Sequence, residues 1–321
     1  MAVTGFPAWV LLSGAVSLVR PETTAWLSGD AVVALLSVAM AGMGTSITPG
    51  ELRDSLRMPR PVLVGFALQY SVMPLCALAA VHATGLAAAS PALAAGVLLT
   101  GVCPGGTASN IVSFIAGADV PLSVLMTCAS TLAACALTPA LAGLLLGTVV
   151  PVDAAAMLAS TLKVVTFPVL AGVALSAALP EGNFKARLTA DVMPLLAVAA
   201  VALICGNVVA QSASALRGFS FDLAARLLLA VTALHAGGFA LGYALPKSGL
   251  GYEETASRTI AIEVGMQNSA LGAVLARAHL ADPLSAVPCA VSATVHSILG
   301  STLAALWRAR DRDRGRDSAV K

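Results

Sequence analysis

The sequence predicts an all-α polytopic membrane protein. Of its 321 residues, 58% are hydrophobic and 11% are charged, whereas soluble domains carry roughly 25% charged residues. The apolar residues form continuous stretches, without the alternation that strands show. Aromatic residues make up only 4% of the chain, which does not fit the aromatic girdles of a transmembrane barrel. The composition therefore excludes soluble, disordered and collagen-like classes.

Ten candidate spans result when the apolar sequence is divided at charged residues, glycines and prolines, such as those in 53–60 and 180–187. A spanning helix needs about 20 largely apolar residues. The predicted spans are 7–19, 31–48, 61–83, 91–115, 120–148, 155–179, 190–211, 223–245, 258–279 and 284–307. The first is short and contains Pro7. Segment 308–321, in which Arg alternates with Asp, is expected to be a solvated cytoplasmic tail.

The loop charges predict the orientation of the chain. Ten spans place both termini on one side, where thirteen basic residues gather against four on the other side. Since cytoplasmic loops are enriched in Lys and Arg, both termini are predicted to be cytoplasmic. The four are Arg20, Arg217, Arg226 and Arg277. These charges lie in loops and the tail, so they indicate no nucleic-acid partner.

Two charged residues, Lys163 and Glu263, lie well inside predicted spans. A charge at that depth costs about 3 kcal/mol, so such residues usually face a cavity, a partner or an ion. Lys163 has a side chain long enough to snorkel toward the start of its span. Glu263 is shorter and lies near Gln267 and Asn268, which favours a functional role.

The segment Cys103–Asn110 places Pro104 and two glycines in the middle of the fourth span. These residues remove a backbone hydrogen bond and loosen the helix, which lipid tolerates only where the freed groups meet protein, water or ligand. A simple packing kink is the alternative, but the oxygen-bearing Thr107, Ser109 and Asn110 follow at once. A broken helix that faces a site is therefore expected.

Ser123 and Thr127 lie four residues apart in the fifth span and so share a helix face. Neutral oxygens of this kind, with a carboxylate for charge balance, suit a hard monovalent cation. The six cysteines all fall in apolar spans with no zinc-like spacing, and they are expected to be small buried residues.

Short matches recur at about half the chain length. Ala67-Leu68-Gln69 is answered by Ala233-Leu234-His235, Ser109-Asn110 by Gln267-Asn268, and Leu122-Ser123 by Leu284-Ser285. They predict two repeats of five spans, residues 1–148 and 149–307. An odd number of spans inverts the second repeat, as in secondary transporters with discontinuous helices at the midplane.

These motifs resemble the bile acid:sodium symporter family, with its bacterial and its plant and algal plastid members. The resemblance covers nearly the whole chain and is carried by Cys103–Asn110, Leu122–Thr127, Glu263–Asn268, and Gln69 with Met73-Pro74. It implies ten helices, a panel domain from spans one, two, six and seven, and a core domain in which broken spans four and nine cross.

The resemblance also implies two sodium sites that share Glu263. One site would use Ser109, Asn110, Ser123, Thr127 and Glu263, and the other Gln69, Glu263, Gln267 and the backbone carbonyls of Val264 and Met266. The substrate anion would lie between panel and core, near Thr107 and Asn268. His296 and Ser297 are further candidates, although Ser297 stands where many bacterial members have Asn. Lys163 stands where plastid relatives tend to have Gln, and is a candidate contact for a substrate carboxylate.

The expected function is sodium-coupled symport of a small organic anion, such as a monocarboxylate or keto acid, or a bile-acid-like compound. No organic cofactor or oligomer is required, and a bacterial plasma membrane or a plastid inner envelope is the expected location. A proton-coupled anion carrier or cation/proton antiporter, with Glu263 titrating beside Lys163, remains open. An intramembrane enzyme is disfavoured, because Glu263 is the only acid expected in the membrane and no Ser/His/Asp arrangement supports catalysis.

Overall fold

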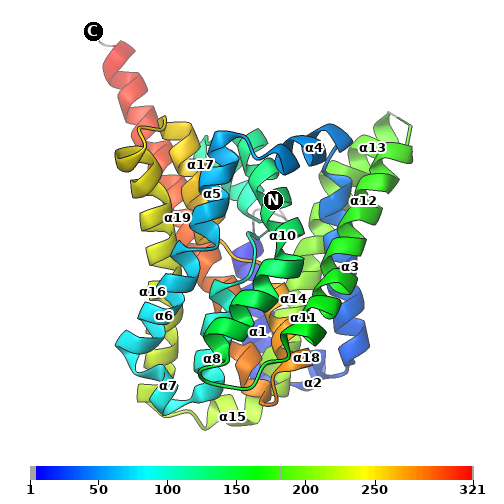
Figure 1. Cartoon of the computed structure of the whole chain (residues 1–321), viewed down its shortest axis with the longest axis vertical. Helices are drawn as coiled ribbons and strands as arrows, with labels where there is room; N and C mark the ends of the chain where they lie inside the picture. The colour runs from blue at the N-terminus through cyan, green and yellow to red at the C-terminus, as the bar shows by residue number, and fades with distance from the viewer. Residues whose placement is uncertain (1–4, 107, 181, 320–321) are drawn as a thin grey trace.

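The computed structural model describes residues 5–106, 108–180 and 182–319, which form a bundle of helices (Figure 1). The first half contains α1 (Phe6–Val19), α2 (Glu22–Ala25), α3 (Gly29–Thr45), α4 (Pro49–Arg57), α5 (Arg60–Gln69), α6 (Val72–Thr84), α7 (Leu86–Ala89), α8 (Pro91–Gly101), α9 (Ser109–Ala116) and α10 (Val120–Leu146). The second half contains α11 (Ala154–Thr161), η1 (Leu162–Thr166), α12 (Phe167–Ala178), α13 (Asn183–Arg187), η2 (Leu188–Val192), α14 (Met193–Gln211), α15 (Ala213–Arg217), α16 (Phe221–Ala244), η3 (Leu245–Gly249), α17 (Glu254–Gly265), α18 (Ser269–His279), η4 (Pro283–Ala286) and α19 (Val287–Ala319).

Six helices in the described part of the chain are long and apolar enough to cross a membrane. They cover Arg60–Thr84, Val120–Leu146, Ala154–Ala178, Met193–Gln211, Phe221–Gly249 and Pro283–Asp313. A seventh results if α3 and α4, which are bent by 92°, are one span. The other predicted spans coincide with shorter helices: α1, the pair α8 and α9, and the pair α17 and α18.

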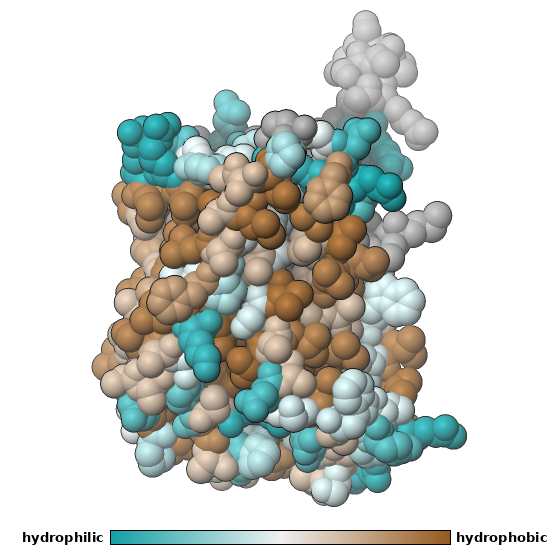
Figure 2. Space-filling model, turned by 90° about the vertical axis from the view of Figure 1, so that its right-hand side faces the viewer, coloured by the Kyte–Doolittle hydropathy of each residue, from teal (hydrophilic) through white to brown (hydrophobic). Residues whose placement is uncertain are grey.

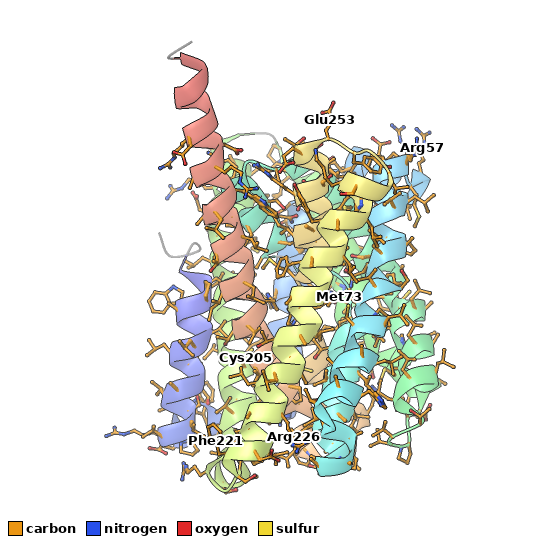
Figure 3. The ribbon with its side chains drawn as sticks, turned by 90° about the vertical axis from the view of Figure 1, so that its left-hand side faces the viewer. Arg57, Met73, Cys205, Phe221, Arg226 and Glu253 are labelled. Atoms are coloured by element: carbon orange, nitrogen blue, oxygen red, sulfur yellow. The ribbon has the colours of Figure 1, made fainter. Side chains whose placement is uncertain are left out.

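The surface and the distribution of charges fit a protein that spans a membrane. Figure 2 shows hydrophobic side chains over most of the height, with hydrophilic ones gathered at the upper and lower ends. Arg57 and Glu253 lie at the upper end, and Phe221 and Arg226 at the lower end (Figure 3). The upper end, with α4, α13 and the C-terminus, is called the α4 end below (Figure 1). The lower end, with α2, α7 and α15, is called the α15 end.

One group of helices, α1, α3, α12 and α14, packs through small residues. A Cβ atom on Gly44 of α3 would come within 2.1 Å of the Val169 carbonyl oxygen, and one on Gly172 of α12 within 2.1 Å of the Ala41 oxygen. Only glycine permits this approach, which is how closely packed membrane helices gain dispersion energy.

A second group of helices surrounds α16, which packs against α6, α17 and α19, while α19 also contacts α9. Gly238 of α16 lies against Met73 of α6 and Gly265 of α17, where a Cβ would come within 2.4 Å of the Met73 sulfur. All six cysteines are free, and Cys103, Cys128, Cys205 and Cys289 are buried. The prediction of small buried cysteines holds for these four, while Cys76 and Cys135 are partly exposed.

The segment after residue 307 is helical, and its described side chains at 308–313 are mostly exposed, while its side of the membrane stays a prediction. Helix α19 continues without a break to Ala319. Asp311 accepts hydrogen bonds from Arg258 Nη1 at 2.7 Å and Nη2 at 2.8 Å, and Arg258 also donates to Glu254 at 3.0 Å. Arg258 is only 2% exposed. Its guanidinium needs buried partners, so the first turn of the tail is held against α17 as helix.

Candidate functional site

Two short segments pair with each other near the centre of the fold. One joins α8 to α9 and the other joins α17 to α18. The Gly106 amide donates to the Met266 carbonyl at 3.0 Å, and the Asn268 amide donates to the Pro104 carbonyl at 2.8 Å. A Cβ on Gly106 would come within 2.7 Å of the Gln267 oxygen, so glycine is required. The pairing satisfies backbone groups that the helix ends leave free, as a lipid environment demands.

Glu263 lies on α17 one turn before this pairing and is 2% exposed. Ser123 of α10 donates to its Oε1, and Thr127 donates to its Oε2 at 2.7 Å. The same two hydroxyls approach Asn110 Oδ1, Ser123 at 2.7 Å and Thr127 at 3.3 Å. Among the residues that the structure describes, no lysine or arginine forms an ion pair with Glu263.

This cluster has more acceptors than donors. Each hydroxyl carries one proton, but the Ser123 hydroxyl faces two acceptors and the Thr127 hydroxyl three, the third being the Ser123 carbonyl at 3.0 Å. The two carboxylate oxygens, the amide oxygen and the hydroxyls converge with a net negative charge. Because no described lysine or arginine pairs with this carboxylate, a bound cation would balance its charge.

Ser109, the first residue of α9, is fully buried and donates to the Gly106 carbonyl at 2.6 Å. Its hydroxyl thereby bonds the segment that pairs with residues 266–268. Of the five residues predicted for the first sodium site, Asn110, Ser123, Thr127 and Glu263 are in hydrogen-bond contact, and Ser109 precedes Asn110 directly.

The residues predicted for the second sodium site also lie together. Gln69 Nε2 donates to the Cys103 carbonyl and to Gln267 Oε1, both at 2.9 Å, and Gln267 Nε2 donates to the Val264 carbonyl at 2.8 Å. The Met266 carbonyl accepts from Gly106. A carbonyl oxygen has two lone pairs, so each of the two predicted carbonyl ligands keeps one. Gln69, Ser130 and Glu263 also line a cavity of about 10 Å³.

A larger cavity of about 200 Å³ lies between α3, α14, α9 and α10. Asn110 and Thr127 form part of its wall, and the rest is mainly apolar, with Met43, Ile47 and Met193 among the lining residues. The Glu263 cluster and this cavity therefore share two side chains. An organic molecule in the cavity would lie directly beside the oxygen cluster.

The predicted substrate residues occupy different places. Asn268 and His296 line a cavity of about 20 Å³ that also reaches Val201 of α14, and Ser297 lines another of about 20 Å³. Lys163 is exposed in η1 and is not among the described residues that line these cavities. Nor does it pair with Glu263, as the proton-coupled alternative required. Thr107 lies outside the described residues.

The sequence reasoning assigned no site role to two polar residues that the structure buries, His235 and Asn207. His235 bonds the Gly265 carbonyl through Nδ1 at 2.9 Å and Ser292 through Nε2 at 2.7 Å. Asn207 of α14 is fully buried and donates to the carbonyls of Thr24 in α2 and Leu27 after it. Both could be recognised in the sequence as hydrogen-bonding side chains inside apolar spans. A neutral polar residue in a span is, however, a weaker indicator of a site than a charged one.

Comparison with known proteins identifies the family. The sequence pattern of the Sodium Bile acid symporter family matches residues 33–218. The chain belongs to this family. It is 47% identical over 307 residues to "Probable sodium/metabolite cotransporter BASS1, chloroplastic" of Arabidopsis thaliana, covering 95% of this chain and 73% of the relative. It is 39% identical to "Probable sodium/metabolite cotransporter BASS2, chloroplastic" of Oryza sativa subsp. japonica, covering 97% and 71%.

A bacterial relative matches over a similar length. "Uncharacterized sodium-dependent transporter YocS" of Bacillus subtilis is 36% identical over 303 residues, covering 94% of this chain and 90% of the relative. The family and these relatives are transporters, which confirms the predicted family and the prediction that the chain is not an enzyme. With its apolar helices, this sodium bile acid symporter family member is an integral membrane transporter.

Proposed function

We propose that the protein is a sodium-coupled symporter of a small organic monoanion. The single observation that carries this proposal is the Glu263 cluster, in which a buried carboxylate and surplus acceptor oxygens have no basic partner among the described residues. Oxygen ligands and one negative charge suit a sodium ion. The sodium-dependent relatives support the same choice.

Two sodium ions are proposed, one at each group of predicted ligands. The first ion takes Ser109, Asn110, Ser123, Thr127 and Glu263. The second takes Gln69, Glu263, Gln267 and the carbonyls of Val264 and Met266. Both groups touch the paired segments, so the ions would stabilise that pairing and, with it, the wall of the cavity that Asn110 and Thr127 form.

The chemistry of the larger cavity favours a short acid with an apolar body. Its volume of about 200 Å³ is below the roughly 300 Å³ at which pockets for drug-sized ligands begin. Ala108, directly before α9, lines it, so the positive end of that helix faces a carboxylate there. We therefore favour a monocarboxylate or keto acid over a bile-acid-like compound. Asn268, His296, Ser297, Thr107 and Lys163 remain proposed substrate contacts.

The proposed architecture has ten spans in two inverted repeats, 1–148 and 149–307, with a panel and a core domain. A pair of equivalent hydrogen bonds supports it: Gln69 bonds the Cys103 carbonyl, and His235, its repeat counterpart, bonds the Gly265 carbonyl. The paired segments are antiparallel, as an inverted repeat requires. Rocking of the two domains would expose the site alternately. The proposal keeps both termini and segment 308–321 cytoplasmic, with a bacterial plasma membrane or plastid inner envelope as location and no organic cofactor.

The test is uptake of labelled acids into proteoliposomes, with and without an inward sodium gradient. Short monocarboxylates should enter only with sodium, and dicarboxylates and a bile acid should enter poorly. Ser123→Ala and Thr127→Ala combined in one protein should remove the sodium dependence. Uptake that follows a proton gradient and survives both substitutions would instead establish the proton-coupled alternative.

A further inference from the structure

Arg277, in the last turn of α18, reaches across to α14. Its Nη1 donates a hydrogen bond to Asn207 Oδ1. The Asn207 amide nitrogen in turn donates to the carbonyls of Thr24 at 2.8 Å and Leu27 at 3.2 Å. The Asn207 side chain is thus held in place by the loop around α2, with its oxygen presented to the arginine.

This contact joins α14 to α18 beyond the small cavity that both helices line, and the space between the two helices is called the cleft below. Val201 of α14 lines both the cavity of about 200 Å³ and the cavity of about 20 Å³ that Ala270 of α18 also lines. At 1.5 Å per residue, Asn207 lies about 9 Å further along α14 than Val201. Cys205, close to Asn207, lies in the lower half of the molecule (Figure 3). The contact therefore lies toward the α15 end.

Neighbouring residues reinforce the closure. His279, two residues after Arg277, bonds Ser160 of α11 at 2.9 Å between Nε2 and Oγ. The end of α18 is thus tied to α14 and to α11 by two polar contacts. These two contacts lie beside the apolar core to which α14 and α18 both contribute, and a hydrogen bond of this kind is lost at a modest net cost of about 1 kcal/mol.

The charge of Arg277 has no acidic partner among the described residues. Its guanidinium is half-buried against a neutral amide, although its planar fork is suited to a carboxylate. The described walls of the larger cavity carry no basic side chain. Arg277 therefore places, at the end of the cleft, the positive charge that an anionic ligand would need.

We propose that Arg277 is an anion-binding residue at the α15 end of the cleft, which binds a carboxylate when α14 and α18 separate and binds Asn207 when they close. The anion enters beside the guanidinium, and the Asn207 oxygen replaces the carboxylate as the end shuts. This rests on the proposed function, because it needs a cleft that opens alternately at its two ends.

The test measures charge selectivity rather than transport. Val201→Cys places a thiol in the cleft, and its reaction with two membrane-impermeant reagents is followed from the α15 side. The reagents are the anionic sulfonatoethyl and the cationic trimethylammonioethyl methanethiosulfonate. The parent without Val201→Cys corrects for the native thiols. A unit charge about 10 Å away in water changes the ratio of the two rates about fourfold.

In the Val201→Cys background, Arg277→Gln should lower the anionic-to-cationic ratio at least about fourfold. Arg277→Lys should keep the ratio, since it keeps the charge. The matched control is Arg217→Gln, which removes an exposed arginine of α15 at the same end. Asn207→Asp gives Arg277 a permanent carboxylate partner and should slow the reaction with both reagents. This variant provides the test if Arg277→Gln does not fold.

An unchanged ratio in Arg277→Gln, or an equal fall in Arg217→Gln, would overturn the proposal. Faster labelling of Asn207→Asp would do so as well, because the new ion pair should hold the end shut. These readouts need no transported substrate. Uptake that does not depend on sodium would therefore contradict the proposed function, whereas the labelling ratio tests the role of Arg277 by itself.

Discussion

Thr127 on α10 donates a hydrogen bond of 2.7 Å to the carboxylate of Glu263 on α17, and so joins two helices that lie more than a hundred residues apart in the chain. Thr127 also lines the larger cavity. Thr127 thus belongs both to the oxygen cluster and to the wall of the larger cavity, which gives the proposed sodium ion a direct route to the proposed substrate site.

Thr127→Ala should weaken sodium binding while the fold is kept. The substitution removes one oxygen ligand and one hydrogen bond to a charged group, worth about 1.5–3 kcal/mol. The sodium concentration for half-maximal uptake should rise at least tenfold, or about 1.4 kcal/mol. Ser113→Ala on α9 is the control, because the buried Ser113 hydroxyl has no partner in the described structure. Equal effects of Thr127→Ala and Ser113→Ala on the half-maximal sodium concentration would contradict a specific role of Thr127 in sodium binding.

Gly106→Ala should destabilise the paired segments. The added Cβ would lie within 2.7 Å of the Gln267 carbonyl oxygen, and backbone contacts of that kind relax poorly. We expect a loss of about 2 kcal/mol, visible as a lower Tm in detergent. Gly249→Ala is the matched control, because its Cβ would meet nothing within 4 Å. A Gly106→Ala protein as stable as that control would argue against tight pairing.

Ala197→Leu should make the transporter more selective for small acids. Ala197 lines the cavity of about 200 Å³, so three added carbons narrow it. Uptake of the larger acids should fall about tenfold more in kcat/KM than uptake of the smallest, a difference of about 1.4 kcal/mol. Ala199→Leu, on the exposed face of the same helix, should leave the ranking of acids unchanged. The same ranking of acids by kcat/KM in Ala197→Leu and Ala199→Leu would show that the substrate binds outside this cavity.

Glu254 should give the α4 end a pH-dependent stability. Burial acts to raise its pKa, but hydrogen bonds from Tyr243, Arg258 and Lys247 outweigh burial and hold the pKa below its usual value. A lowered pKa in the folded state stabilises above the unfolded pKa, about 4.3, and this contribution is lost as the pH falls further. Glu254→Gln should therefore lower Tm at pH 7 and lose that effect toward pH 3. A difference in Tm between the wild type and Glu254→Gln that stays constant from pH 7 to pH 3 would contradict this prediction.

The sequence was informative where a few residues carried unusual chemistry. Glu263 was recognised as a charge inside an apolar span, and the spacing of Ser123 and Thr127 placed both on one helix face. The structure brings these three together with Asn110. The all-helical membrane class followed from composition, because burial of a long apolar helix in lipid hardly depends on its exact neighbours.

Other features depended on tertiary contacts that no local pattern contains. The walls of the larger cavity come from α3, α9, α10 and α14, so its size required the packing of all four. The helical tail depends on Arg258, which was counted only as a loop charge. Arg277 was likewise read as a loop charge, and its contact with Asn207 joins residues seventy positions apart.

The central claim is that the Glu263 carboxylate binds the coupling sodium. Uptake of a short monocarboxylate in proteoliposomes, measured against sodium concentration, tests it most directly in the wild type and in Glu263→Gln, which keeps the side-chain shape and removes the charge. We predict sodium-stimulated uptake in the wild type and no sodium stimulation in Glu263→Gln. Equal sodium stimulation in both proteins would contradict the account.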